Sequence, residues 1–253
     1  MNHPAGGDEP VLKSSELLAW RRANGQLSDF PVPKAVIFAP QRSLANYVLR
    51  RHSTRQVKGF LGEFHLLKRT NGKLAFSTGF GIGAPVVAGL ADEFAAMGVQ
   101  QFVLIGLAGG IQPELATGNL VLSTGAIRGE GASSHYLPAS PQVETSARLT
   151  RGIHEILENQ KYPHSLGLTW TTDAPFRERR KDVLEYQKQG VLAVDMEAAA
   201  LLAVARSMEL PAAAAFSIAD QLSDGHWRMA SDLRPAQKGL AILFDAIYEY
   251  LSQ

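Results

Sequence analysis

One acidic segment of this 253-residue chain lies at the expected junction between a buried strand and a helix. Asp195, Met196 and Glu197 lie between a short apolar run and an alanine-rich stretch. Acids are costly at such a junction unless they are exposed or hydrogen-bonded. Asp195 fits the ordinary role of an acid that complements a helix dipole. Glu197 is the better ligand candidate, because its carboxylate could accept hydrogen bonds from two sugar hydroxyls while Met196 packs on the sugar.

A second acid, Asp220, directly follows the apolar run from 212 to 218. Burial at the carboxyl end of a strand raises the pKa of a carboxyl group toward values that suit proton transfer. The alternative, an N-cap for the following turn, is already supplied by Asp224 before Gly225. We therefore interpret Asp220 as a catalytic acid.

Two glycine-rich segments complete the candidate site. Residues 77–85 (STGFGIGAP) could present backbone N–H groups to an anion, but they contain no Walker lysine and no dinucleotide pattern. A tight strand-to-helix bend is the favoured interpretation. Residues 105–113 (IGLAGGIQP) have three glycines in five positions, which bring the backbone close either to a ligand or to a neighbouring strand. Both readings stay open.

The elements that must position these residues alternate along the chain. Apolar runs and turn signals predict strands at 35–39, 102–105, 120–127, 165–171, 192–194 and 212–218, a hairpin at 60–68 and 73–77, and helices at 85–97, 145–159, 177–189, 197–208 and 235–250. This order predicts a single-domain, three-layer α/β/α fold with a mixed central sheet. We assign residues 1–33 to an N-terminal tail with a short helix and residues 34–253 to the catalytic domain.

Composition excludes several classes of protein. Lys plus Arg is 25 and Asp plus Glu is 24, so there is no electrostatic footprint for nucleic acid or a membrane surface. The chain has no cysteine, which excludes disulfides and thiolate metal sites, and we expect no metal. No secretory signal pattern opens the chain, and its apolar runs are too short to span a bilayer. We expect a cytoplasmic protein.

The motifs agree, in order and spacing, with one family. Residues 77–138 resemble uridine phosphorylase and its relatives through STGFGIG, GLAGGIQPELATGNLVLST and IRGEGASSHYLP. The Asp-Met-Glu segment with its alanine-rich helix is similar to the ribose-binding signature of the nucleoside phosphorylase superfamily, which also includes purine nucleoside phosphorylases and methylthioadenosine nucleosidases. TTDAPFRERR and FSIADQLSDG extend the match to roughly four-fifths of the chain.

The resemblance implies a twisted sheet, a homo-oligomer (dimer, trimer or hexamer), and cleavage of the N-glycosidic bond of a nucleoside. It places the ribose on Met196 and Glu197, and the base against Phe176 with Arg179 or Thr172 near its polar edge. Purine-cleaving members have an aspartate at the position of Asp220, which protonates the departing base, whereas uridine phosphorylases lack it. A purine is therefore favoured and uridine is possible. Inorganic phosphate would be the co-substrate, and no other cofactor is implied.

The phosphate site of the family is incomplete here. Ala45 and Leu104 fall where arginines are expected, and Leu107 replaces a hydroxyl residue. The arginine usually lent by a neighbouring subunit falls near Leu61, with only Lys58 close by. A phosphate dianion needs several charge-assisted donors. Arg42, by a shift of register, and the backbone at Gly109 are the groups left to hold an anion.

Three functions follow from these patterns. The first is a nucleoside phosphorylase, a pentosyltransferase with phosphate as acceptor. The second is a nucleosidase that uses water, although Ser43 stands where nucleosidases place a glutamate. The third is a non-catalytic nucleoside-binding protein; Glu197 and Asp220 argue against it, because a binder needs no proton donor.

Overall fold

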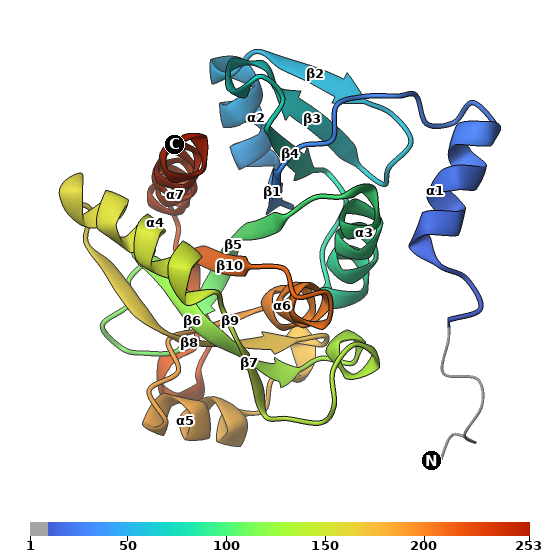
Figure 1. The fold of residues 1–253 in the computed structure, drawn as a ribbon. Helices are drawn as coiled ribbons and strands as arrows, with labels where there is room; N and C mark the ends of the chain where they lie inside the picture. The colour runs from blue at the N-terminus through green and yellow to red at the C-terminus, as the bar shows by residue number, and fades with distance from the viewer. Residues whose placement is uncertain (1–9) are drawn as a thin grey trace.

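The computed structural model describes residues 10–253, in which one mixed sheet carries helices on both of its faces (Figure 1). The strands are β1 Ala35–Ala39, β2 Thr54–Val57, β3 Glu63–Leu67, β4 Leu74–Thr78, β5 Gln101–Gly110, β6 Leu120–Gly129, β7 Gln142–Glu144, β8 His164–Thr172, β9 Ala193–Asp195, β10 Ala212–Gln221 and β11 Arg228–Met229. The helices are α1 Ser14–Ala23, α2 Arg42–Arg51, α3 Ala84–Met97, α4 Ala147–Asn159, α5 Arg180–Lys188, α6 Ala198–Ser207 and α7 Arg234–Ser252. The predicted mixed α/β fold is confirmed.

Part of the sheet closes on itself, which the sequence analysis did not predict. Strand β10 pairs with both β5 and β6, β6 pairs with β8, and β9 joins β8 to β5. These five strands therefore form a ring, and β1, β4, β3 and β2 extend from β5 as an open sheet. Closure removes exposed edges on one side of the sheet and brings the ends of β5, β9 and β10 together.

Two apolar clusters separate the sheet from its helices. On one face, α3 and α6 pack on the sheet through residues such as Phe94 and Leu201, and Leu18 of α1 joins this cluster. On the other face, α2, α4 and α7 contribute residues such as Leu44, Ile153 and Phe244. Helix α6 is buried along almost its whole length, because small alanine side chains let it approach the ring of strands closely.

Most elements match the predicted ranges within a few residues, and the hairpin of β3 and β4 is antiparallel as expected. One helix was missed: residues after Pro40 form α2, and its buried face consists of Leu44, Ala45 and Val48. That spacing is typical of a helix, but the predicted elements include none between residues 39 and 60. Residues 1–9 of the predicted tail lie outside the described part of the chain, and the boundary at residue 34 stays a prediction.

No helix among residues 10–253 combines the length and the apolar character needed to cross a bilayer.

Candidate active site

A cavity of about 620 Å³ lies where β5, β9 and β10 end. This volume suits a small organic ligand. One side is formed by the junction of β9 with α6, a second by the end of β10 and the turn after it, and a third by the segment that leads into α5. The cavity therefore occupies the carboxyl end of the sheet, where open α/β sheets bind ligands.

Asp195 acts as the helix N-terminal acid that we expected. It is buried, and its Oδ1 accepts hydrogen bonds from the backbone N–H groups of Glu197 at 2.8 Å and Ala198 at 2.7 Å. The hydroxyl of Thr171 also donates to this carboxylate, at 3.1 Å. Burial raises the pKa of Asp195 to about 6, against the lowering effect of these bonds. Its oxygens are occupied by the protein, so Asp195 positions the start of α6.

Glu197 contacts the first glycine-rich segment, residues 77–85. The backbone N–H of Gly83 donates to Glu197 Oε1 at 2.6 Å, and Gly83 has a φ of 108° at the start of α3. The bend that we favoured for residues 77–85 is confirmed, since Gly79, Gly81 and Gly83 all have positive φ. The anion that the loop holds is the protein's own carboxylate. Glu197 itself lines the cavity.

The ionised form of Glu197 is energetically unfavourable in this position. Its side chain is buried, and burial, followed by the nearby Asp195, raises the pKa of Glu197 to about 7, while the Gly83 N–H opposes the shift. A carboxylate that is poorly solvated by the protein gains more from ligand hydroxyls than one that is already solvated.

Asp220 lies near the end of β10, next to an irregularity in the register between β10 and β5. The indole N–H of Trp227 donates to Asp220 Oδ2 at 2.7 Å. Burial raises the pKa of Asp220, although the bond from Trp227 opposes this. The carboxyl group faces the same cavity as Glu197.

A second carboxyl group lies beside Asp220. Glu178 lines the cavity, and burial, with the charge of Asp220 as a smaller cause, raises the pKa of Glu178 to about 7. Two carboxyl groups that repel each other lose their protons in two steps that belong to the pair. The pair of Glu178 and Asp220 therefore keeps one proton at pH values where an exposed carboxyl group would have lost it.

Of the three residues predicted to bind the base, one lines the cavity and two do not. Phe176 lines the cavity with its ring 98% exposed. Arg179 does not line it; its Nε donates to Asp182 at 2.6 Å on the outer surface. Thr172 is buried outside the lining, where its hydroxyl accepts the N–H of Ala174. The chain is extended at Arg179 and α5 begins at Arg180, so Arg180 faces the cavity in place of Arg179.

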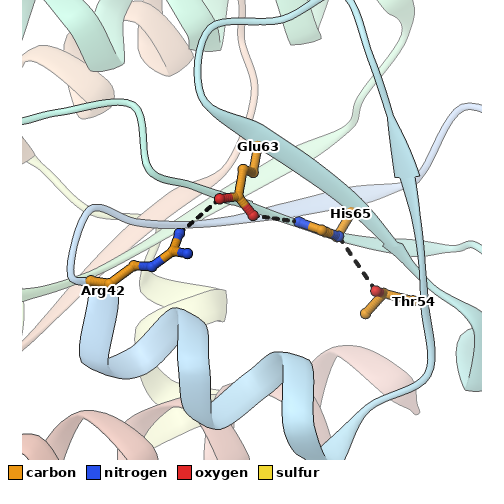
Figure 2. A network of polar contacts seen from close by, with 4 residues as sticks. All are labelled: Arg42, Thr54, Glu63 and His65. Atoms are coloured by element: carbon orange, nitrogen blue, oxygen red, sulfur yellow. Dashed lines mark hydrogen bonds and ion pairs between the residues drawn. The ribbon is translucent and has the colours of Figure 1, made fainter.

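Arg42 also lies outside the cavity lining. From the first turn of α2, its Nη1 donates to Glu63 Oε1 on β3 at 2.7 Å (Figure 2). The other oxygen of Glu63 contacts His65 Nε2 at 3.1 Å, and the Thr54 hydroxyl lies 3.4 Å from His65 Nδ1. The bond from Arg42 lowers the pKa of Glu63, which keeps the pair charged. The expectation that Arg42 rescues the phosphate site has no support here, because its charge is matched by Glu63.

The other positions at which the family has phosphate ligands hold apolar side chains here, and none of these side chains can bind an anion. Leu104 and Ala45 are fully buried in the core, and Leu61 is exposed. Leu107 lines the cavity. A side chain at Gly109 would collide with Leu222, so close packing explains this glycine, although its backbone also borders the cavity.

The cavity is strongly acidic. Among residues 10–253, four lining residues carry carboxyl groups, namely Glu178, Asp195, Glu197 and Asp220, and Arg180 is the one basic residue. This arrangement repels free anions and attracts neutral ligands with many hydroxyl or N–H donors. None of the described histidines lines the cavity.

Four residues of the lining that have hydrogen-bonding side chains were not predicted as site residues: Gln41, Glu178, Arg180 and Trp227. Glu178 could have been predicted, because it lies in the segment from Phe176 to Arg179 that was predicted to contact the base. Trp227 enters through the short pairing of β11 with β10, for which the sequence has no clear signal. Gln41 lies in the first loop, and its side-chain oxygen is buried with no hydrogen-bond partner among the described residues.

Comparisons with known proteins agree with this geometry. The model of the phosphorylase superfamily matches residues 41–249. A guanosine phosphorylase of Halorubrum lacusprofundi is 31% identical over 154 residues, which are 59% of this chain and 62% of that protein. A uridine phosphorylase of Klebsiella aerogenes is 30% identical over 156 residues, 56% of this chain and 62% of that protein. The matched part thus spans less than two thirds of these relatives. The family match covers most of the chain, which therefore belongs to the phosphorylase superfamily.

Proposed function

We propose that this protein cleaves the N-glycosidic bond of a nucleoside, with a purine favoured as the base. The observation that carries the proposal is one cavity in which Glu197 and Met196 lie on one wall and the pair of Asp220 and Glu178 on another. The first group suits a sugar and the second suits a leaving base. Relatives named guanosine phosphorylase and uridine phosphorylase support a nucleoside as the substrate.

At the sugar end, Glu197 accepts hydrogen bonds from two ribose hydroxyls. Gly83 holds its Oε1, which fixes the carboxylate at the cavity. Met196 supplies the apolar surface on which the sugar packs. The sugar becomes positively charged as the bond to the base breaks, and a nearby carboxylate stabilises that charge.

At the base end, the acid pair delivers a proton to a ring nitrogen of the departing purine. The C–N bond breaks with its electron pair going to the base, and the proton neutralises the charge that develops there. Trp227 fixes Asp220 by its hydrogen bond, and Phe176 offers an exposed ring for stacking. The purine preference rests on this acid pair, since a ring nitrogen that takes a proton makes use of it.

Phosphate is the acceptor that the family and the names of the relatives support, and it would make this chain a phosphorylase. The acidic lining favours a second candidate, a nucleosidase that uses water. A phosphate dianion would face four carboxyl groups, and Arg180 is the one lining residue with a formal positive charge in the described part of the chain. Such an ion is held in partly buried sites by several charged donors.

Gln41 supports the second candidate. Its side-chain oxygen is buried without a partner among residues 10–253, and the residue lines the cavity. An unpaired buried acceptor costs roughly 1–3 kcal/mol, which a water molecule would recover. A water held there would be oriented by Gln41.

A panel of guanosine, inosine, adenosine and uridine tests the proposal, with free base measured by chromatography in the presence and absence of phosphate. We expect release of a purine base by the native protein and loss of that release in Asp220→Asn. The exposed acid Glu114 lies outside the cavity lining, so Glu114→Gln is the control and should keep full activity. Binding of a nucleoside without base release would instead identify a non-catalytic nucleoside-binding protein and refute the proposal.

A further inference from the structure

Three potential metal ligands gather away from the candidate active site. His154 and Glu158 lie on α4, and His164 begins β8. One ligand atom from each lies within 4.8 Å of the others. None of the three lines the acidic cavity. Imidazole nitrogens with a carboxylate oxygen are a donor set that suits zinc and similar divalent transition metals.

Hydrogen bonding fixes which nitrogen of His164 is free. His164 Nδ1 lies 2.9 Å from the carbonyl oxygen of Tyr162, and that oxygen can only accept. Nδ1 of His164 therefore carries a proton, and in the neutral ring Nε2 has a lone pair. Its side chain is 0% exposed. A backbone carbonyl that orients a histidine in this way is the usual second-layer partner of a metal ligand.

The lone pair of His164 points at the second histidine. His154 Nδ1 lies 2.7 Å from His164 Nε2, so His154 donates its Nδ1 proton in the metal-free protein. A zinc ion with bonds of about 2.0–2.1 Å needs its tetrahedral nitrogen ligands roughly 3.3 Å apart. The rings must separate by a few tenths of an ångström to admit the ion, a shift within reach of a partly exposed helix side chain.

Glu158 completes the set from the same helix as His154. Residues four apart in a helix share one face. Glu158 Oε1 lies 3.8 Å from His164 Nδ1, the nitrogen of that ring that does not bind the ion, so the Glu158 side chain must turn to reach it. This side chain is 63% exposed, which leaves room for the turn. His154 also borders a second cavity of about 640 Å³. Arg151 and Glu144 line that cavity too, so their opposite charges offset each other. Water from this cavity would fill the remaining coordination position.

We propose that His154, Glu158 and His164 form a site for one divalent zinc-like cation that ties the end of α4 to the start of β8. On binding, the proton of His154 moves from Nδ1 to Nε2, and Nδ1 then joins His164 Nε2 as a ligand. Both histidines stay neutral, and no oxidant or other reactant is needed. The ion would clamp the short turn between the two elements.

Calorimetric titration with Zn²⁺, and absorption spectroscopy with Co²⁺ as a probe, test this site in full-length protein. All samples carry His3→Gln, so that the histidine near the amino terminus adds no ligand. We expect one ion per chain, a rise in melting temperature on binding, and a loss of affinity of at least about 100-fold in His154→Gln. Glu158→Gln should weaken binding by about 10-fold. The exposed His135 is the control, and His135→Gln should bind as the parent does.

Nitrogen-15 NMR of the histidine rings provides a readout that does not depend on the folding of any variant. The metal-free protein should show His154 protonated at Nδ1, and zinc should move that proton to Nε2. Absence of saturable binding at one ion per chain would overturn the proposal. So would binding that His154→Gln leaves unchanged, or an unaltered His154 tautomer in the zinc-loaded protein.

Discussion

Replacement of Glu197 by glutamine should stabilise the protein while it removes activity. The carboxyl group of Glu197 has a pKa of about 7 in the folded protein and a reference value of 4.5. Between these values the folded chain keeps a proton that the unfolded chain has lost. The stability that this proton contributes is fully present below pH 4.5 and is lost as the pH rises through about 7.

The structure sets the size of the effect. A pKa change of one unit corresponds to about 1.36 kcal/mol, so the shift of Glu197 costs up to about 3 kcal/mol above pH 8. Glutamine removes that charge, and its side-chain oxygen can still accept the N–H of Gly83. We expect Glu197→Gln to raise the free energy of unfolding by about 1–3 kcal/mol at pH 8 and by little at pH 4.5. Activity should fall roughly 10- to 100-fold, because an amide cannot accept two sugar hydroxyls as a carboxylate does.

Urea denaturation at a series of pH values, with an activity assay on the same samples, measures both effects. Glu114→Gln, which changes an exposed acid, is the control and should show neither. A Glu197→Gln protein that is less stable than the native protein at pH 8 would refute the reasoning about burial. Full activity of this variant on ribonucleosides would refute the assignment of the sugar.

Four further outcomes follow from the same geometry. Asp220→Asn should abolish cleavage of natural purine nucleosides but largely spare nitrophenyl ribosides, whose leaving group needs no proton; equal loss on both, measured by steady-state rates, would contradict the role of the acid. The value of kcat/KM should fall on both sides of about pH 7. It falls at lower pH because Glu197 gains a proton, and at higher pH because the pair of Glu178 and Asp220 loses one. Glu178→Gln should move the alkaline limb of the profile, and an unchanged limb would exclude Glu178 from the pair. Arg179→Ala should leave KM nearly unchanged and Arg180→Ala should change it; the reverse result would restore Arg179 to the base. Added phosphate should not change the rate if the acidic lining excludes it, and a phosphate-dependent rate would show that the anion site is rebuilt by groups outside this lining.

The places of Met196, Glu197 and Asp220 in the cavity were predictable because the sequence signal for each is local. Met196 and Glu197 lie directly after a buried strand and before an alanine-rich helix, and Asp220 lies near the end of another strand. A strand that ends at the carboxyl edge of a sheet delivers the next residues to the ligand site, whatever the other strands do. For these residues, order along the chain was enough.

The wall of the cavity between Phe176 and Arg180 was less predictable, because it depends on the residue at which an extended segment ends and α5 begins. A difference of one residue decides whether Arg179 or Arg180 faces the cavity, and helix boundaries are the least reliable feature of a sequence prediction. Glu178 acquires its raised pKa partly from Asp220, which is remote in the sequence. The ring of strands was not predictable either, since the pairing of β10 with both β5 and β6 is a property of the packed sheet.

The most direct test of the central claim is the product formed from a purine nucleoside by the purified protein, followed by mass spectrometry with and without phosphate. We expect free purine base together with a ribose product, which is ribose 1-phosphate if phosphate is the acceptor and free ribose if it is water. We also expect Asp220→Asn to abolish both products. Absence of free base from every nucleoside tested, with the native protein folded and either acceptor present, would contradict the claim that this cavity breaks the N-glycosidic bond.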